Sequence, residues 1–311
     1  MVCGICGSNN YTEIGIIKNI WQNDKKVYQC NNCKLYYIEY PTEDEMNNLY
    51  KNEYHKYWLY HNGKNKIKNK IFEYAKFKIR YSRSLSQFKF INSLFKDIKN
   101  KHNIKICEIG AFDGLLLKIF KDNGFSVYGY ELNDYAREYA QNKYDIKLKS
   151  NFLTDNEKYD VIILSHILEH FIKPKDILLK IKSMLNSNGV LYIEVPNSPM
   201  IDEVSKDVLI DYLTTEHTVN FSPSNLSILL KNTKFNIIDI KYSNYNVNKD
   251  NIYLKSFILK GCMPNLKNII PFALFGIKTF IAPDLSFTNY DCSNTKWSYG
   301  ENIRVIANSI D

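Results

Sequence analysis

The 311-residue sequence has no uninterrupted apolar run of 18 residues, so it lacks a segment that could cross a bilayer as one helix. Its first residues, MVCGICGSNN, have neither a basic start nor an apolar stretch, which argues against a secretory signal peptide. Four of the seven cysteines form two close pairs and the other three are scattered, a pattern unlike a disulfide framework. These absences predict a soluble cytoplasmic protein in a reducing compartment.

Positive charge is in excess, but it is not concentrated. The formal net charge is +8, and the lysines are spread among many asparagines and tyrosines. The densest basic stretch, Lys64–Lys78, also contains Glu73. Nucleic-acid-binding proteins gather their basic residues on one face, so this distribution argues against a nucleic-acid partner. We interpret the excess as a solvated surface, with an anion-binding patch as the alternative.

Two Cys-x-x-Cys motifs, CGIC and CNNC, lie within the first 33 residues and are separated by 23 residues. Two such pairs can supply four thiolates to one tetrahedral Zn²⁺. The alternative is a set of four free thiols. We predict a zinc ribbon over residues 1–40 that binds a structural zinc ion. Its ligands are Cys3, Cys6, Cys30 and Cys33.

The remainder of the chain divides into two regions by its pattern. Residues 41–100 are polar, aromatic and helical in periodicity, and we expect a linker or a cap over the substrate. Residues 101–311 alternate strand-like and helix-like segments, which predicts an α/β domain with a doubly wound, mostly parallel sheet of seven strands. The predicted strands are Ile104–Ile109, Phe125–Glu131, Lys147–Phe152, Tyr159–Ser165, Val190–Val195, Phe235–Tyr242 and Ile303–Ala307.

Residues 246–300 interrupt this alternation before the last predicted strand. Within them, Ile269–Ala282 is apolar except for Lys278 and contains a proline and a glycine. We expect an insertion that forms a helical lid or the contact face of a homo-oligomer. An interfacial membrane contact is the alternative.

The segment KICEIGAFDGLLLKIF is typical of a strand, a glycine loop and a helix in succession. Gly110 allows a sharp turn after the strand, and Gly114 allows the helix to approach a ligand closely. The acidic residues Glu108 and Asp113 suit a cationic amino-acid moiety and repel a pyrophosphate. Glu131 ends the next strand, where a carboxylate can accept both hydroxyls of a ribose.

With these motifs the sequence resembles the class I S-adenosylmethionine-dependent methyltransferases that carry an N-terminal zinc ribbon. After the cysteine pairs come EIGAFDGLLL, YGYELND, YDVIILSHILEH, GVLYIEVPN and EHTVNFSPSNLSILLKNTKF, in that order, over nearly all of residues 1–242. Several such proteins methylate deoxysugars on nucleotide carriers or cell-surface glycans. The resemblance implies a Rossmann-like fold and methyl transfer from S-adenosylmethionine to a sugar hydroxyl or amine, on a nucleotide-linked sugar or in polysaccharide biosynthesis.

Two departures from the family pattern bear on this expectation. Phe112 stands where a glycine is usual in the cofactor loop. The sugar C-methyltransferases of this group carry a further large C-terminal domain, and the roughly seventy residues after 242 are too few for it. We therefore expect transfer to oxygen or nitrogen rather than to carbon.

The resemblance places the cofactor at the carboxyl ends of the strands, where open α/β sheets bind their ligands. The implied residues are Glu108, Gly110, Asp113 and Gly114 at the methionine end, Glu131 and the adjacent Leu132 at the ribose, Asn151 and Phe152 at the adenine, and Ser165 and His166 at the floor.

Methyl transfer to a hydroxyl requires an aligned oxygen and the removal of its proton. Three candidates follow the fourth and fifth predicted strands: His170 in LEH, and Glu216 and His217 in TTEHT. Histidines at corresponding positions act in sugar-methylating relatives. A neutral imidazole can accept the proton while a carboxylate steadies the imidazolium. We predict His217 as the general base, Glu216 as its orienting partner or a substrate ligand, and His170 as a positioning residue.

The predicted substrate-binding residues are Tyr54 and Tyr57, in an aromatic run that could close over the acceptor, and Asn197. A packing role is the alternative for the two tyrosines. His166 and His170, four residues apart, could bind a metal from one helix face, but only two ligands are evident there.

Two other functions remain open from the sequence. One is an RNA methyltransferase whose zinc ribbon binds RNA. Against it, no Asn-Pro-Pro-Tyr motif of the base-methylating type follows the fourth strand. The other is a non-catalytic module that keeps only the fold.

Overall fold

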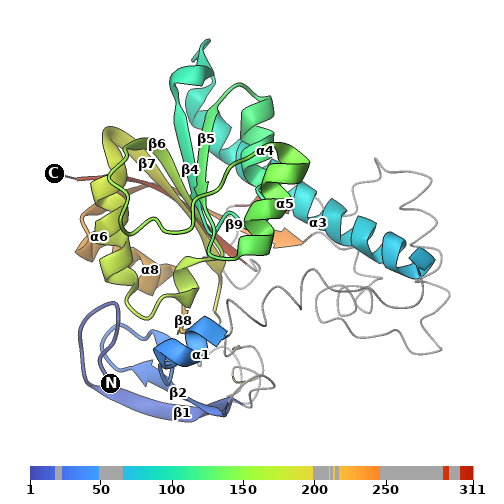
Figure 1. The fold of residues 1–311 in the computed structure, drawn as a ribbon. Coiled ribbons are helices and arrows are strands. Elements are labelled where there is room, and N and C mark those ends of the chain that lie inside the picture. The colour runs from blue at the N-terminus through green and yellow to red at the C-terminus, as the bar shows by residue number, and fades with distance from the viewer. Residues whose placement is uncertain are drawn as a thin grey trace.

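The computed structural model describes residues 1–17, 23–48, 66–198, 210, 213, 217–245, 290–293 and 302–310. These residues form two sheets, one of four strands and one of seven, with helices on both faces of the larger sheet (Figure 1). Over the described ranges, no helix combines the length and the apolar character needed to cross a membrane.

The smaller sheet joins the N-terminal segment to a strand from far along the chain. Its strands are β1 (Tyr11–Ile17), β2 (Lys25–Cys30), β3 (Tyr36–Ile38) and β8 (Val219–Asn220), all antiparallel in that order. A short helix, α1 (Glu43–Asn48), follows β3. Because β8 pairs with β3, the segment just before β8 is held beside the cysteine-rich region.

The larger sheet has the order β10-β9-β11-β7-β6-β4-β5. Its strands are β4 (Lys105–Ile109), β5 (Ser126–Tyr130), β6 (Tyr159–Ser165), β7 (Leu185–Pro196), β9 (Phe235–Tyr245), β10 (Tyr290–Ser293) and β11 (Asn302–Ser309). The pairs among β4, β5, β6 and β7 are parallel, whereas β11 runs antiparallel to both β7 and β9. The carboxyl ends of the four parallel strands therefore meet at one edge.

Helices cover the two faces of this sheet and bury separate parts of the core. They are α3 (Lys66–Asn92), α4 (Leu115–Asp122), α5 (Asp134–Tyr144), α6 (Pro174–Met184) and α8 (Pro223–Asn232), with 3₁₀ turns η2 (Ser93–Phe95), η3 (Lys101–Asn103) and η4 (Leu168–His170). Side chains of α3, α4 and α5 pack on one face, and side chains of α6 and α8 pack on the other (Figure 1). The start of α8 is capped by Ser222, which accepts a hydrogen bond from the amide of Asn225.

The predicted α/β fold with a mostly parallel sheet is confirmed, and six of the predicted strands correspond to β4, β5, β6, β7, β9 and β11. The predicted strand over 147–152 is wrong, since only Lys149 pairs with β5, through a single bridge to Tyr130. The side chain of Asn151 accepts the amide of Leu153, and this local turn competes with a strand ladder.

The strand β10 was not predicted, because its residues lie in the expected insertion of residues 246–300. It pairs with the outer side of β9 and extends the sheet. The remainder of that stretch, residues 246–289 and 294–300, lies outside the described residues, as does the apolar segment on which the lid prediction depends. The predicted domain limits at residues 40 and 100 stay predictions.

Candidate active site

The candidate site lies where β4, β5, β6 and β7 end, and it begins with the glycine loop after β4. Gly110 and Gly114 both adopt left-handed conformations, with φ of 72° and 76°. A Cβ on Gly110 would lie 2.7 Å from Cδ1 of Ile167, in the loop after β6. Glycine is required here because the loops after β4 and β6 touch.

Glu108, the acid that the sequence assigns to the methionine end, is 6% exposed. Its Oε2 atom has no hydrogen-bond partner among the described residues. Burial raises the pKa of Glu108 well above its usual value, and the nearby carboxylate of Asp113 adds to that shift. A buried carboxylate oxygen without a partner is costly, so this position fits a ligand that brings an ammonium group.

Asp113 has a partner within the chain that the sequence did not reveal. Its Oδ2 lies 2.7 Å from Nη1 of Arg80 in α3, and the same guanidinium lies 5.5 Å from the centre of the Phe112 ring. Phe112 itself has a positive φ of 47°. Arg80 therefore fixes the middle of the cofactor loop, and the role of Asp113 in this structure is to bind Arg80.

Glu131 accepts hydrogen bonds from two backbone amides, those of Phe112 and Asn133, each at 2.9 Å. Burial raises the pKa of Glu131, and these amides counteract the shift. Each carboxylate oxygen keeps a second lone pair, so the group can still accept ribose hydroxyls. Leu132 next to it is 64% exposed.

The residues implied at the adenine end differ in environment. Phe152 is buried, with its ring edge-on to Tyr130 and Phe171 at 6.2 Å each. Asn151 is exposed, and its side-chain oxygen already accepts the amide of Leu153. Phe152 is suited to form an apolar wall of an adenine site, and Asn151 is held in a turn at the edge of that site.

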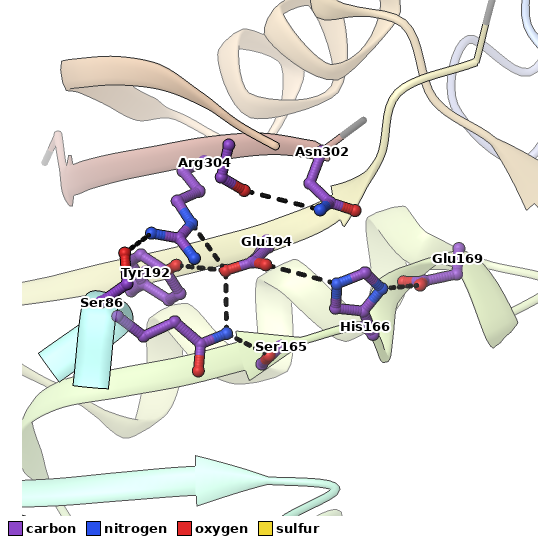
Figure 2. Close-up of polar contacts among 10 residues, drawn as sticks. Ser86, Ser165, His166, Glu169, Tyr192, Glu194, Asn302 and Arg304 are labelled. Carbon is purple, nitrogen blue, oxygen red and sulfur yellow. Dashed lines mark hydrogen bonds and ion pairs between the residues drawn. The ribbon is translucent and has the colours of Figure 1, made fainter. Parts of the chain in front are cut away.

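A buried polar network connects the sheet to the loop after β6 (Figure 2). Glu194 of β7 forms an ion pair with Arg304 of β11 at 2.8 Å, and both side chains are fully buried. The Glu194 carboxylate also accepts from Tyr192 at 2.6 Å and from Gln87 at 2.8 Å. Burial would raise the pKa of Glu194, but Arg304 outweighs it and holds that pKa well below its usual range.

The network continues through His166 to Glu169. Nε2 of His166 lies 3.4 Å from Glu194, and Nδ1 lies 3.5 Å from Glu169 (Figure 2). Burial lowers the pKa of His166, but the two carboxylates outweigh it and raise the pKa above its ordinary value. Ser165, also expected at the cofactor floor, accepts a hydrogen bond from Gln87 at 2.7 Å.

The structure brings His170 and His217 together, as the predicted acceptor site requires. His170 ends η4, His217 lies two residues before β8, and their ring centres are 5.0 Å apart. Thr218 donates to the carbonyl oxygen of Glu169 at 3.1 Å and so joins the two segments. Burial lowers the pKa of His217 to about 3, with His170 adding to the shift, so its imidazole is neutral.

Glu169 completes this group, although the sequence did not single it out. Burial would raise the pKa of its carboxyl, but the imidazoles of His166 and His170 outweigh that effect and lower the pKa. The signal was present in LEH, where the acid adjoins His170. Of the other predicted residues, Asn197 is buried just after β7. Glu216, Tyr54 and Tyr57 lie outside the described residues.

The four cysteines of the two motifs converge in one cluster. The Sγ atoms of Cys3 and Cys33 lie 3.5 Å apart, and so do those of Cys6 and Cys30. Thiolates at about 2.3 Å from one Zn²⁺ are separated by a little under 4 Å, so the donor set and its spacing fit that ion.

Comparison with known proteins adds a family match. A family model described as a methyltransferase domain matches residues 78–240. The ubiquinone biosynthesis O-methyltransferase of Pelagibacter ubique (strain HTCC1062) is 28% identical over 226 residues, covering 65% of this chain and 91% of that protein. That of Rickettsia bellii (strain OSU 85-389) is 23% identical over 179 residues, covering 51% and 75%.

Solved structures with similar folds include a magnesium protoporphyrin IX methyltransferase from Synechocystis PCC 6803 with bound SAH. It has a TM-score of 0.49 and 15% sequence identity, and the match covers 65% of this chain and 93% of that one.

Proposed function

This chain belongs to the methyltransferase-domain family and is an S-adenosylmethionine-dependent methyltransferase, and we propose that its acceptor is a hydroxyl group of a small molecule, on a sugar or a sugar nucleotide. Transfer to oxygen is favoured over transfer to nitrogen because the curated relatives are O-methyltransferases. The sugar is proposed from the resemblance of the ribbon and the later motifs to sugar-methylating enzymes.

The observation that carries this proposal is the position of His170 and His217 beside the cofactor loop. His170 ends the turn that begins after Ile167, and Ile167 lies against Gly110. Thr218 joins the His217 segment to Glu169 in the same turn. Two imidazoles at this place can hydrogen-bond to the acceptor hydroxyl and can assist the removal of its proton. No such pair would be needed if the domain only bound its cofactor.

The cofactor would supply a methyl group on a sulfonium, an excellent leaving group. Glu108 would pair with its ammonium group, and Glu131 would accept its ribose hydroxyls. Gly110 and Gly114 would leave room for the backbone to approach it. Asp113 would act through Arg80, by holding Phe112 in place.

We also propose that Cys3, Cys6, Cys30 and Cys33 hold a structural zinc ion. The four-cysteine cluster supports this, as does the pairing of β3 with β8. Because His217 lies two residues before β8, the ribbon would also position an acceptor-site residue.

A second acceptor class is a phenolic hydroxyl. It is favoured by the relatives named as ubiquinone biosynthesis O-methyltransferases, one of which is matched over 91% of its length. Phenols are more acidic than sugar hydroxyls and would require less help from the imidazoles.

The test is a methyl-transfer screen with labelled S-adenosylmethionine against nucleotide sugars, free glycans, catechols and RNA, with the product mass and methyl position determined. Sugar products would support the first proposal, and catechol products the second. Transfer to RNA, together with salt-dependent RNA retention, would contradict both. His217→Asn should lower turnover by about 10²–10⁴-fold while cofactor affinity is kept.

A further inference from the structure

Three side chains at the acceptor end converge in a way that methyl transfer alone does not require. One potential ligand atom from each of Glu169, His170 and His217 lies within 4.8 Å of the other two. Glu169 is 1% exposed, and its side-chain contact with Nδ1 of His166 is long, at 3.5 Å from Oε1. A cation bound directly to the carboxylate would offset the cost of its burial more fully than an imidazole at that distance.

The donor set is that of a transition-metal site. Two imidazoles and one carboxylate bind Zn²⁺, Mn²⁺, Fe²⁺ or Co²⁺, whereas Mg²⁺ and Ca²⁺ prefer oxygen ligands alone. Two ligands on one ion, each about 2.1 Å from it, can be at most about 4.2 Å apart. Because the three atoms lie within 4.8 Å of one another, small side-chain rotations are enough to bring them onto one ion.

The surroundings of Glu169 are those of a supported metal ligand. Nδ1 of His166 lies 3.5 Å from Oε1 of Glu169, and its Nε2 faces Glu194, which Arg304 holds (Figure 2). Partners behind a ligating carboxylate fix its orientation and are often as important as the ligands. The hydrogen bond from Thr218 to the Glu169 carbonyl keeps His217 at the same place.

We propose that Glu169, His170 and His217 bind one divalent transition-metal cation, which receives the hydroxyl oxygen of the methyl acceptor. The part of this inference that concerns the hydroxyl rests on the proposed function, whereas the cation site does not. With the ion bound, the His217 lone pair is used as a ligand. The acceptor hydroxyl, acidified by the cation, then gives its proton to water. This differs from the sequence prediction, in which His217 takes the proton directly.

The experiment uses the full chain with its thiolate cluster loaded with zinc, then titrates Mn²⁺ and follows the free-ion signal by electron paramagnetic resonance. Mn²⁺ is chosen because it binds thiolate clusters poorly. One Mn²⁺ per chain should bind, and Glu169→Gln and His170→Ala should each weaken that binding at least about tenfold. The control is His102→Ala, which removes an exposed histidine of η3 and should bind as wild type does.

The outcomes separate the cation site from the proposed function. Thermal melts identify any variant that fails to fold, and His217→Asn then serves as the replacement. Absence of Mn²⁺ binding by the wild type, or equal binding by folded Glu169→Gln, would overturn the site. If chelated protein still methylates an acceptor, the cation proposal fails, the proposed function stands, and His217 is the direct base. Mn²⁺ binding without transfer to any acceptor would keep the site and reject the proposed function.

Discussion

Nε of Arg304 lies 2.8 Å from Oε2 of Glu194, and these two fully buried side chains belong to neighbouring strands of the larger sheet. The pair links the last strand of the chain to the loop after β6, because Glu194 also faces His166. A fully buried ion pair adds little net stability relative to apolar residues, but loss of one partner leaves a charge buried alone. Its position suggests that it orients the candidate site.

Arg304→Met should therefore destabilise the fold strongly. We expect a loss of about 3–5 kcal/mol in the free energy of unfolding near pH 7, measured by denaturant titration. The double variant Arg304→Met with Glu194→Gln removes both charges and should recover part of this loss. Equal destabilisation by the single and the double variant would show that the uncompensated charge is not the cause.

The ribose assignment predicts a defect confined to cofactor binding. Glu131→Ala should weaken S-adenosylmethionine binding by roughly 1.5–3 kcal/mol, the range for hydrogen bonds to a charged group. Titration calorimetry measures this directly. Glu138→Ala, which removes an exposed acid from α5 nearby, is the matched control and should bind normally. Unchanged affinity in Glu131→Ala would mean that the carboxylate only holds the amides of Phe112 and Asn133.

The zinc assignment predicts effects at two distant places. Cys30→Ser combined with Cys33→Ser should abolish bound zinc, measured by elemental analysis, and cost several kcal/mol of stability. Because β3 pairs with β8, turnover should fall further than cofactor affinity, as His217 loses its position. Cys262→Ser, outside both motifs, should keep the metal. A metal-free wild type of full stability would contradict the assignment.

The parts that sequence reasoning could predict are local. The glycine loop after β4, the acid after β5 and His170 after β6 all follow strand ends, so their placement follows from the α/β pattern. His217 instead lies before β8, and it was predicted from the resemblance to sugar-methylating enzymes. Arg80 and Gln87 were missed because they lie on a long helix and reach Asp113 and Glu194 across 33 and 107 residues. No residue close to Arg80 or Gln87 in the sequence indicates contacts at such long separations.

The same limit explains Arg304. In the sequence it is a lone arginine in an apolar strand. A strand pattern indicates which face is buried, but it does not reveal the charged partner on the neighbouring strand. Conversely, the strand predicted over 147–152 was wrong because an asparagine turn competes with the ladder at a sheet edge, where no second neighbour enforces pairing.

The environment of Glu108 predicts a specific pH dependence. Burial raises its pKa, so the free protein prefers the protonated form, whereas a ligand ammonium prefers the carboxylate. Stability from this group is fully present below the ordinary carboxyl pKa of about 4.3 and is lost as pH rises through the raised pKa. Over that window, the affinity for S-adenosylmethionine should rise.

Glu108→Gln tests both halves of this linkage, because glutamine keeps the shape without the charge. Relative to wild type, the free variant should gain stability as pH rises above the ordinary carboxyl pKa of about 4.3 and through the raised pKa of Glu108, and its cofactor affinity should lose the rise with pH. Denaturant titration and calorimetry at matched pH values measure the two differences, so titrations elsewhere cancel. A wild-type affinity independent of pH, paired with an unaltered affinity in Glu108→Gln, would show that the buried carboxylate does not bind the ammonium group. The partnerless Oε2 atom would then need another cation to explain it.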